Sequence, residues 1–273
     1  RELLGREMTE KTSTGPVALI TGGSAGIGLE LSKLFAADNY NLVIVSKPAE
    51  ELVAARNTLL SHHPGIEIKT IQKDLSIQGA ASEVYNEVKE AGIDVEVLVN
   101  NAGFGTWGFM NEIPLEKELS MINLNVVTLY HFTRLFLADM IEKNRGKILN
   151  VSSTAGLHPV PHFATYSATK SFSLFLSEAL NFELKQSGSA VSVTALCPPP
   201  VRTGFQKASG MEKSNLFKKS STMEAPEVAK AAYEALFQKK PMILPSRSYR
   251  MMFKFMKLLS KNSVMKGMLE GMK

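Results

Sequence analysis

Short β-branched runs alternate along the chain with longer segments whose apolar residues recur every three or four positions. This alternation is typical of strand-helix-strand units around a parallel sheet. The runs predict seven strands, beginning near Val17, Leu42, Ile66, Val95, Lys147, Val191 and Met242. We therefore expect an α/β fold with an open, doubly wound sheet of about seven strands and helices on both faces.

Helical periodicity fills the segments between the strands. One helix should begin near Ile27, directly after the first strand, and another near Tyr166. A third is indicated by apolar residues in three- and four-residue steps at Ile77, Ala81, Val84, Val88 and Ala91.

Three segments lack this alternation of strand and helix patterns, and they suggest the domain organisation. Residues 1–15 are polar and aperiodic, so we expect a mobile arm ahead of a single catalytic domain over residues 16–246. Residues 198–225 are rich in Pro, Ser, Gly and Lys, and so long a connection is typical of a lid over a binding site. Residues 247–273 form a basic tail.

The formal charge of +5 is concentrated in this tail. Residues 247–273 carry seven Lys and Arg against Glu270 alone, a net charge of +6, which leaves −1 on the rest of the chain. The body is therefore nearly neutral, and the sequence has neither zinc-finger spacing nor an aromatic RNA-binding signature. We expect no nucleic-acid partner.

The single cysteine, Cys197, cannot form an internal disulfide, and no Cys/His cluster has metal-ligand spacing. The sequence therefore favours a reducing compartment and predicts no metal. It also shows no apolar signal core and no run of 18 apolar residues. The cytoplasm is the expected location.

A glycine-rich turn follows the first predicted strand. Glycine permits positive φ and a close approach of the backbone, so N–H groups at the start of the next helix can meet a pyrophosphate. The alternative interpretation of this segment is an ordinary tight turn. Because the segment lies between the first strand and the first helix, dinucleotide binding is favoured. The expected contacts are Thr21, Gly22, Gly23, Ser24, Ala25, Gly26, Ile27 and Gly28.

Tyr166 and Lys170 lie four positions apart at the start of a helix, so they share a face. A phenol of pKa ~10 exchanges protons poorly at neutral pH, and a neighbouring ammonium is expected to lower that pKa. Ser153 follows the fifth strand, where its hydroxyl can donate a hydrogen bond to a substrate oxygen. Taken singly, the pair is more often a solvated helical face and the serine a turn residue.

Together these motifs resemble those of the short-chain dehydrogenase/reductase family in its compact single-domain form. The resemblance covers roughly residues 15 to 245 and rests on Thr21-Gly22-x-x-x-Gly26-x-Gly28, Asn100-Asn101-Ala102-Gly103, Ser153 and Tyr166-x-x-x-Lys170. It implies a Rossmann-like fold and an NAD(P)-dependent enzyme that interconverts a carbonyl and a secondary alcohol, with Tyr166 as general acid/base. It also implies that Asn125 completes a catalytic tetrad by holding a water beside Lys170.

The resemblance assigns further cofactor contacts. Tyr166 and Lys170 would lie at the nicotinamide ribose, and Val201 and Thr203 at the carboxamide. The adenine would be met by Asp74 and Leu75, and the flat rings would be approached by Asn100, Asn101, Ala102 and Gly103. One motif departs from the family, because Pro199 stands where glycine is usual, which fixes φ and removes an N–H donor.

The end of the second strand bears on the choice of cofactor. A carboxylate there would repel a 2′-phosphate, but the strand ends in Ser46-Lys47. NADP(H) is therefore favoured over NAD(H), although Ala25 stands where many NADP-preferring relatives have a basic residue.

The loops expected around Tyr166 are mainly apolar and aromatic, which favours an apolar carbonyl substrate. The expected pocket residues are Phe104, Trp107, Leu157, His158, Val160, His162, Phe163 and Phe205.

The tail interleaves Met, Phe and Leu with Lys and Arg, which predicts a basic amphipathic helix or a pair of helices. It would either cover the core of a subunit or a dimer surface, or bind an anionic membrane. The resemblance also implies a homodimer or homotetramer through the helices around residues 115–142 and 166–186.

Two other functions fit the fold. A catalytically idle, dinucleotide-binding sensor would not need Ser153, Tyr166 and Lys170 together. An epimerase or dehydratase would usually have different glycine spacing and a larger substrate lobe.

Overall fold

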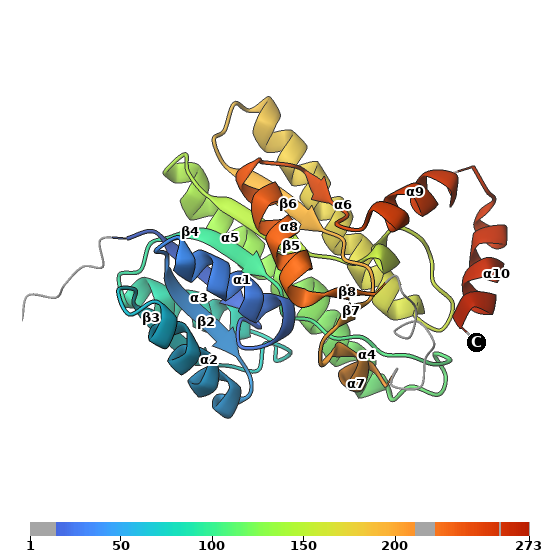
Figure 1. The fold of residues 1–273 in the computed structure, drawn as a ribbon, viewed down its shortest axis with the longest axis horizontal. Helices are drawn as coiled ribbons and strands as arrows, with labels where there is room; N and C mark the ends of the chain where they lie inside the picture. The colour runs from blue at the N-terminus through green and yellow to red at the C-terminus, as the bar shows by residue number, and fades with distance from the viewer. Residues whose placement is uncertain (1–14, 211–221, 257, 273) are drawn as a thin grey trace, which may run out of the picture.

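A parallel sheet of seven strands lies at the centre of the computed structural model, in the order β3-β2-β1-β4-β5-β6-β9 (Figure 1). The strands are β1 Val17–Thr21, β2 Asn41–Ser46, β3 Ile68–Gln72, β4 Val95–Asn100, β5 Lys147–Val151, β6 Ser192–Leu196 and β9 Met242–Ile243. Neighbouring strands all pair in parallel. The predicted doubly wound fold is confirmed. The structure describes residues 15–210, 222–256 and 258–272.

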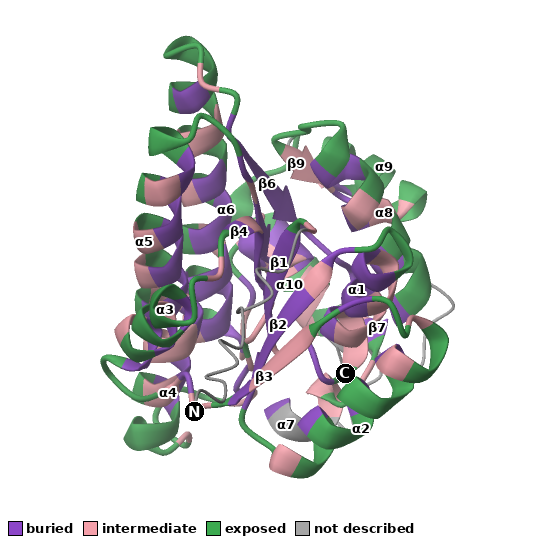
Figure 2. Cartoon of the chain, turned by 90° about the vertical axis from the view of Figure 1, so that its left-hand side faces the viewer, coloured by how far each residue is buried: buried purple, intermediate pink, exposed green. Residues whose placement is uncertain are grey.

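Helices cover both faces of the sheet. They are α1 Gly26–Ala37, α2 Ala49–His62, α3 Ala80–Glu90, α4 Leu115–Ile122, α5 Leu129–Glu142, α6 Ala164–Gln186 and α8 Ala225–Phe237. One core cluster joins the sheet to α1, α2 and α8, and a second joins it to α3, α5 and α6. The central strands β1, β2, β4, β5 and β6 are therefore buried on both sides (Figure 2), which explains their largely apolar runs, whereas the edge strands β3 and β9 are only partly buried.

Successive residues of β1 serve the two layers in turn. Ala18 and Ile20 belong to the first cluster, and Val17 and Leu19 belong to the second. This period of two is the expected side-chain alternation of a strand.

Two local expectations differ from the structure. The helix expected from Ile77 begins only at Ala80, because Gly79 at φ 86° turns the chain there, and Ile77 is exposed. A π-helical turn, η1 (Asn123–Thr128), joins α4 to α5 and was not indicated by the hydrophobic pattern.

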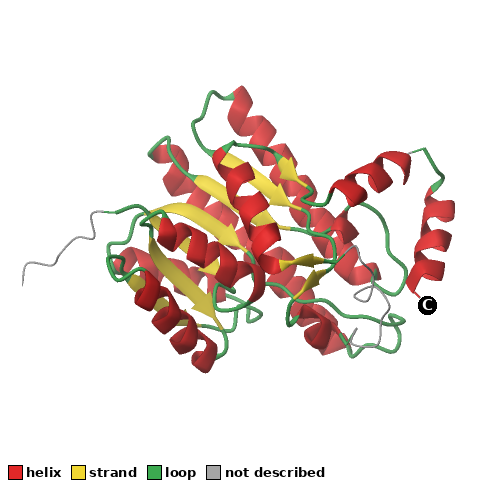
Figure 3. Cartoon of the chain, viewed as in Figure 1, coloured by secondary structure: helices red, strands yellow, loops and turns green. Residues whose placement is uncertain are grey.

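The expected lid is tied to the domain at both ends. Strands β7 (Val201–Arg202) and β8 (Met223–Glu224) pair in parallel as a small second sheet, seen apart from the main one in Figure 3. A short helix, α7 (Phe205–Ser209), follows β7. The rest of the lid, residues 211–221, and residues 1–14 of the expected arm lie outside the described residues.

The tail forms two helices, α9 (Arg247–Met256) and α10 (Lys261–Met272), set at an angle at one side of the molecule (Figure 1). Phe253 and Val264 are buried, so the tail covers part of its own subunit. None of the described helices has the length and continuous hydropathy needed to cross a bilayer.

Helix α1 packs directly on the glycine-rich turn at Gly28. A Cβ at this position would lie 2.1 Å from the carbonyl oxygen of Gly22 and 2.5 Å from Nδ2 of Asn101. Both contacts are far inside van der Waals distance, so only glycine lets the helix, the turn and β4 meet.

The substitution Gly28→Ala should therefore lower the free energy of unfolding by about 2 kcal/mol or more, as overpacking does. This corresponds to a fall in Tm of roughly 5 °C, measurable by thermal denaturation. Gly65→Ala is the matched control, because its Cβ would meet nothing within 4 Å. Equal Tm values for the two variants would contradict the packing argument.

Candidate active site

The predicted functional motifs meet around one cavity of about 1200 Å³ at the carboxyl ends of the strands. This is where open α/β sheets bind ligands. The volume exceeds the ~300–1000 Å³ of a usual small-molecule site. It is large enough for an extended cofactor together with a substrate.

The glycine-rich turn forms one wall of the cavity. Gly22, Ala25, Gly26 and Ile27 line it, and Gly22 and Gly26 have φ of +64° and +52°. The other predicted contacts in this motif, Thr21, Gly23, Ser24 and Gly28, do not line the cavity. They build the turn instead: Thr21 and Ser24 are buried, and a Cβ on Gly23 or Gly28 would crowd its neighbours.

Asn101 connects this turn to the end of β4. Its backbone N–H donates to Oγ1 of Thr21 at 3.0 Å, and its Nδ2 donates to the carbonyl oxygens of Thr21 and Gly22 at 3.0 and 3.1 Å. The turn is therefore fixed in shape by the protein itself.

The start of α1 fits a pyrophosphate. Ala25 is the N-cap residue of α1, and no side chain accepts a hydrogen bond from the free N–H groups there. The first turn of α1 carries no acidic residue. The N–H groups there, together with the helix dipole, favour an anion. Gly22, Ala25, Gly26 and Ile27 would hold the cofactor's phosphates.

The expected adenosine end lies beside β2 and β3. Ser46, Lys47, Asp74 and Leu75 all line the cavity there. Lys47 forms a 2.6 Å ion pair with Asp74. Burial opposes ionisation of Asp74, but hydrogen bonds from Lys47 and Ser76 outweigh it and hold its pKa below the usual value.

Glu51, from the first turn of α2, also lines this end and was missed by the sequence reasoning. Oγ of Ser24 lies 3.1 Å from Oε2 of Glu51 and 2.8 Å from Oγ of Ser46. The end of β2 itself carries no carboxylate, as the sequence indicates, but Glu51 brings one to the same end of the cavity from the following helix. Acidic residues early in the following helix were the available signal.

Asn100 is a correction to the predicted cofactor contacts. It is buried and does not line the cavity. Its Nδ2 donates to Oγ1 of Thr133 at 3.1 Å and to Oδ1 of Asn150 at 2.9 Å. Asn150 in turn donates to Ser177 at 2.9 Å, so this residue belongs to a polar network that joins β4 and β5 to α5 and α6.

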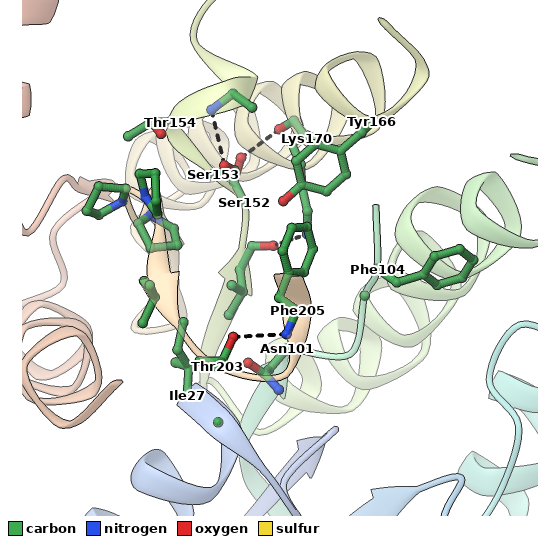
Figure 4. Close-up of a pocket in the computed structure, with 18 of the residues that line it drawn as sticks. Ile27, Asn101, Phe104, Ser152, Ser153, Thr154, Tyr166, Lys170, Thr203 and Phe205 are labelled. Carbon is green, nitrogen blue, oxygen red and sulfur yellow. Dashed lines mark hydrogen bonds between the residues drawn. The ribbon is translucent and has the colours of Figure 1, made fainter. Parts of the chain in front are cut away.

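Ser153, Tyr166 and Lys170 come together in the cavity, across from Ile27 and Thr203 in the view of Figure 4. Nζ of Lys170 donates to the carbonyl oxygen of Val151 at 2.8 Å and lies 5.8 Å from the centre of the Tyr166 ring. Ser153 caps the short helix η2 (Thr154–Gly156), its Oγ accepting from the N–H of Ala155 at 3.1 Å.

The electrostatics of this group differ from the expectation that Lys170 lowers the pKa of Tyr166. Burial raises the pKa of Tyr166 to about 12, and a hydrogen bond from Ser153 opposes that rise. Burial lowers the pKa of Lys170 to about 8, against the opposing influence of Cys197. The ammonium of Lys170 is directed toward a backbone carbonyl rather than toward the phenol oxygen of Tyr166. Burial is therefore the main cause of the pKa shift of both groups.

Asn125 lies in η1 and does not line the cavity. Its Nδ2 donates to the carbonyl oxygen of Phe104 at 2.9 Å and to Oγ1 of Thr169 at 3.1 Å. A Cβ on Gly103 would lie 2.9 Å from Oδ1 of Asn125 and 3.3 Å from Nζ of Lys170. Gly103 therefore lies between the side chains of Asn125 and Lys170, and a larger residue there would crowd both.

The lid residues predicted to meet the carboxamide, Val201 and Thr203, line the cavity with the three prolines before them. The carbonyl oxygens of Pro198 and Pro200 accept from the N–H groups of Thr154 and Met223, at 3.0 and 3.1 Å. The proline run thus anchors this wall.

The substrate side is apolar, and Phe104, Val160, Phe163 and Phe205 line it. Ala102 and Gly103 line its border with the cofactor end. A Cβ on Gly105 would come within 3.2 Å of the Phe163, Tyr166 and Phe205 rings, so glycine makes room for this aromatic wall.

Four of the predicted pocket residues lie behind this wall or beside it. Trp107 packs edge-on against Phe163, Leu157 belongs to the cluster around Leu174, and His158 stacks on Phe253 at 5.3 Å between ring centroids. His162 lines a separate small cavity. These side chains support the chamber from loops whose direction the sequence could not give.

The tail supplies lining residues that the sequence reasoning did not assign to the site. They come from the inner faces of α9, α10 and their connection, and are Ser248, Tyr249, Met252, Phe253, Met256, Leu259, Ser263, Val264, Gly267 and Met268. Met268 also packs against the cluster that contains Tyr166. The two helices therefore close the apolar side of the cavity.

Comparison with known proteins identifies the family. A family model described as short chain dehydrogenase matches residues 16–214. The chain belongs to the short-chain dehydrogenase/reductase family. As a member of this family it is an NAD(P)-dependent oxidoreductase, and the predicted recognition is confirmed.

Individual relatives of this dehydrogenase/reductase agree with the assignment. A Mus musculus protein named very-long-chain 3-oxoacyl-CoA reductase is 33% identical over 224 residues, which are 80% of this chain and 69% of that protein. For the rat and duck proteins of the same name, the match covers 62% of their length.

Solved structures match over most of the chain. A Sphingobium yanoikuyae short-chain dehydrogenase in complex with NADPH has a TM-score of 0.79 and 26% identity, covering 94% of this chain and 96% of that one. A Burkholderia phymatum member in complex with NAD has the same TM-score and identity, covering 88% and 92%. A nicotinamide dinucleotide is thus the cofactor class of this dehydrogenase/reductase.

The pKa of Lys170 makes a prediction about the pH dependence of carbonyl reduction. Below about pH 8 the lysine is an ammonium, which stabilises negative charge on Tyr166 as that phenol gives up its proton. The value of kcat/KM for reduction should therefore fall as pH rises through about 8, while Tyr166 itself stays protonated up to about pH 12. A profile that is flat from pH 6 to 10 would contradict this role.

Proposed function

We propose that the protein is an NADP(H)-dependent oxidoreductase that interconverts an apolar ketone and its secondary alcohol. The observation that carries this proposal is the position of Ser153, Tyr166 and Lys170 on one cavity, between a pyrophosphate-binding turn and an apolar chamber. The polar groups lie where these two halves of the cavity meet.

The proposed mechanism assigns a separate task to each side chain. A bound nicotinamide dinucleotide supplies or accepts the hydride. Ser153 donates a hydrogen bond to the reacting oxygen, and Tyr166 gives its proton to that oxygen in reduction or takes it in oxidation. Lys170 stabilises the phenolate formed on Tyr166, and Asn125 is a positioning residue that acts through Lys170.

The lining of the chamber supports an apolar substrate with a long or bulky chain. Aromatic residues stand next to Tyr166, and the tail extends the apolar lining with methionines, whose flexible side chains adapt to different shapes. The mouse relative is named for a very-long-chain 3-oxoacyl-CoA, whose acyl chain is long and apolar.

For the cofactor, Ser46, Lys47 and Lys73 support a preference for NADP(H). All three line the expected adenosine end, where a hydroxyl and two cations could meet a 2′-phosphate. The carboxylate of Glu51 acts in the opposite direction, because it lies at the same end and would repel that phosphate.

A homo-oligomer is proposed through the outer faces of α4, α5 and α6. These faces carry large apolar side chains exposed in the single chain, namely Leu115, Leu119, Tyr130, Ile141, Phe172, Phe175 and Phe182. Such an exposed apolar face is typical of a subunit interface.

Tyr166→Phe tests the reaction directly. Removing the proton donor should lower kcat for ketone reduction by ~10²–10⁴-fold, measured as loss of reduced-nicotinamide absorbance. Ser153→Ala should lower it by about 10²-fold or more. Cofactor binding, followed by fluorescence, should persist in both variants. If the wild-type protein binds NADPH but reduces none of a broad set of ketones, the sensor hypothesis replaces the enzyme.

Glu51→Gln tests the control of cofactor choice. The amide keeps a hydrogen-bonding group near Ser24 but removes the charge, so the ratio of kcat/KM for NADPH over NADH should rise about fivefold or more. Glu50→Gln is the control, because Glu50 is the exposed neighbour on α2 and does not line the cavity. An unchanged ratio in Glu51→Gln would remove Glu51 from this role.

A further inference from the structure

Helix α9 carries apolar side chains on two faces. Its inner face, with Tyr249, Phe253 and Met256, lines the cavity. Three other side chains, Met251 on α9, Phe255 on α9 and Leu258 just after it, do not line the cavity and are 63%, 66% and 82% exposed. Met251 and Phe255 are four positions apart on α9 and therefore share a face. Together with Leu258, in the turn that follows the helix, they are here called the outer stripe.

The outer stripe is adjacent in sequence to two exposed residues of the cavity wall. Met252 and Leu259 line the cavity, yet they are 41% and 57% exposed. Each of them is the direct neighbour in sequence of a stripe residue. An apolar ligand that enters between them would therefore pass next to the stripe.

Cations flank the outer stripe. Arg247, Arg250 and Lys254 on α9, and Lys261 and Lys266 on α10, are all exposed. Within the described part of the chain, none of these five forms an ion pair. Uncompensated positive charge beside exposed apolar side chains is the pattern of a helix that lies on an anionic lipid surface.

Charge distinguishes this surface from the exposed apolar face of α4, α5 and α6. That face carries acidic side chains at Glu116, Glu142, Glu178 and Glu183 together with basic ones at Lys117, Arg134 and Lys185. The charges there nearly cancel, so an anionic bilayer would be attracted by α9 and α10 rather than by that face. The two apolar surfaces are thus suited to different partners.

We propose that the outer stripe and its flanking cations dock the enzyme on an anionic lipid bilayer. The cavity then opens toward the lipid between Met252 and Leu259, and an apolar ketone reaches Tyr166 without crossing water. The docking is inferred from the residues of α9, α10 and their connection alone, whereas the delivery of substrate rests on the proposed function. With one short stripe and no lipid anchor on these residues, binding should be reversible and should weaken with salt.

Vesicle sedimentation tests the docking. The full chain is mixed at low salt with vesicles of phosphatidylcholine and phosphatidylglycerol, or of phosphatidylcholine alone. We expect at least tenfold more bound protein on the anionic vesicles, and loss of most of it in 0.5 M salt, roughly fivefold above the ionic strength at which screening acts over ~10 Å.

Two variants identify the surface. Phe255→Ser/Leu258→Ser should reduce binding to the anionic vesicles at least tenfold, and Arg250→Gln/Lys254→Gln should reduce it while keeping the apolar stripe. Val53→Ser, at a 60% exposed apolar position on α2, is the matched control and should bind as the wild type does. Absence of wild-type binding, or equal binding by all variants, would overturn the proposal.

Sedimentation velocity without lipid tests the competing occupant, a second copy of the chain. The proposal expects Phe255→Ser/Leu258→Ser to keep the wild-type oligomeric state. If this variant instead dissociates the oligomer, the outer stripe is a subunit interface and the proposal fails.

Delivery is measured by comparing a short, water-soluble ketone with a long-chain ketone held in the vesicles. The variant Phe255→Ser/Leu258→Ser should convert the soluble ketone to its alcohol at the wild-type rate. It should convert the lipid-held ketone at least fivefold more slowly than the wild type does. Equal losses on both would contradict delivery from the lipid. Vesicle binding without turnover of either ketone would leave docking supported and the proposed function refuted.

Discussion

The ammonium group of Lys170 is held inside the protein beside the end of β5, and much of the site is arranged around it. Burying a cation is costly unless hydrogen bonds compensate, and here Nζ donates to the carbonyl oxygen of Val151. Two glycines make room for Lys170, Gly103 beside its ammonium group and Gly156 beside its backbone carbonyl group. A Cβ on Gly156 would lie 2.7 Å from the carbonyl group of Lys170, and one on Gly103 would crowd its ammonium.

The cavity around Lys170 has two halves of opposite character. Toward the amino-terminal strands, the turn before α1 and the ends of β2 and β3 offer N–H groups, hydroxyls and charges. Toward the carboxyl-terminal segments, the aromatic wall and the two tail helices offer mainly apolar surface. Ser153 and Tyr166 stand at the junction, where a charged cofactor and an apolar ketone can meet at one reacting oxygen.

The sequence predicted the sheet well, because continuous apolar runs, glycines and helical periodicity are local signals. It also predicted that Tyr166 and Lys170 face the same space, since a spacing of four along a helix fixes a shared face. The direction of Lys170 could not be predicted, because it depends on a carbonyl group nineteen positions away in the chain. Glu51 was absent from the predicted contacts and Asn100 was included among them for a related reason: the surroundings of both are created by tertiary packing. The tail could be predicted as amphipathic, but only the fold shows that its inner face closes the cavity.

The central claim is that this site moves a hydride to a carbonyl carbon while Tyr166 supplies the proton. The most direct measurement uses reduced nicotinamide cofactor with deuterium at the transferred position, a ketone accepted by the protein, and mass spectrometry of the product. The account predicts one deuterium on the carbinol carbon and a slower single turnover in D₂O. A product without the label, or a bound cofactor that is never oxidised by any ketone, would contradict it.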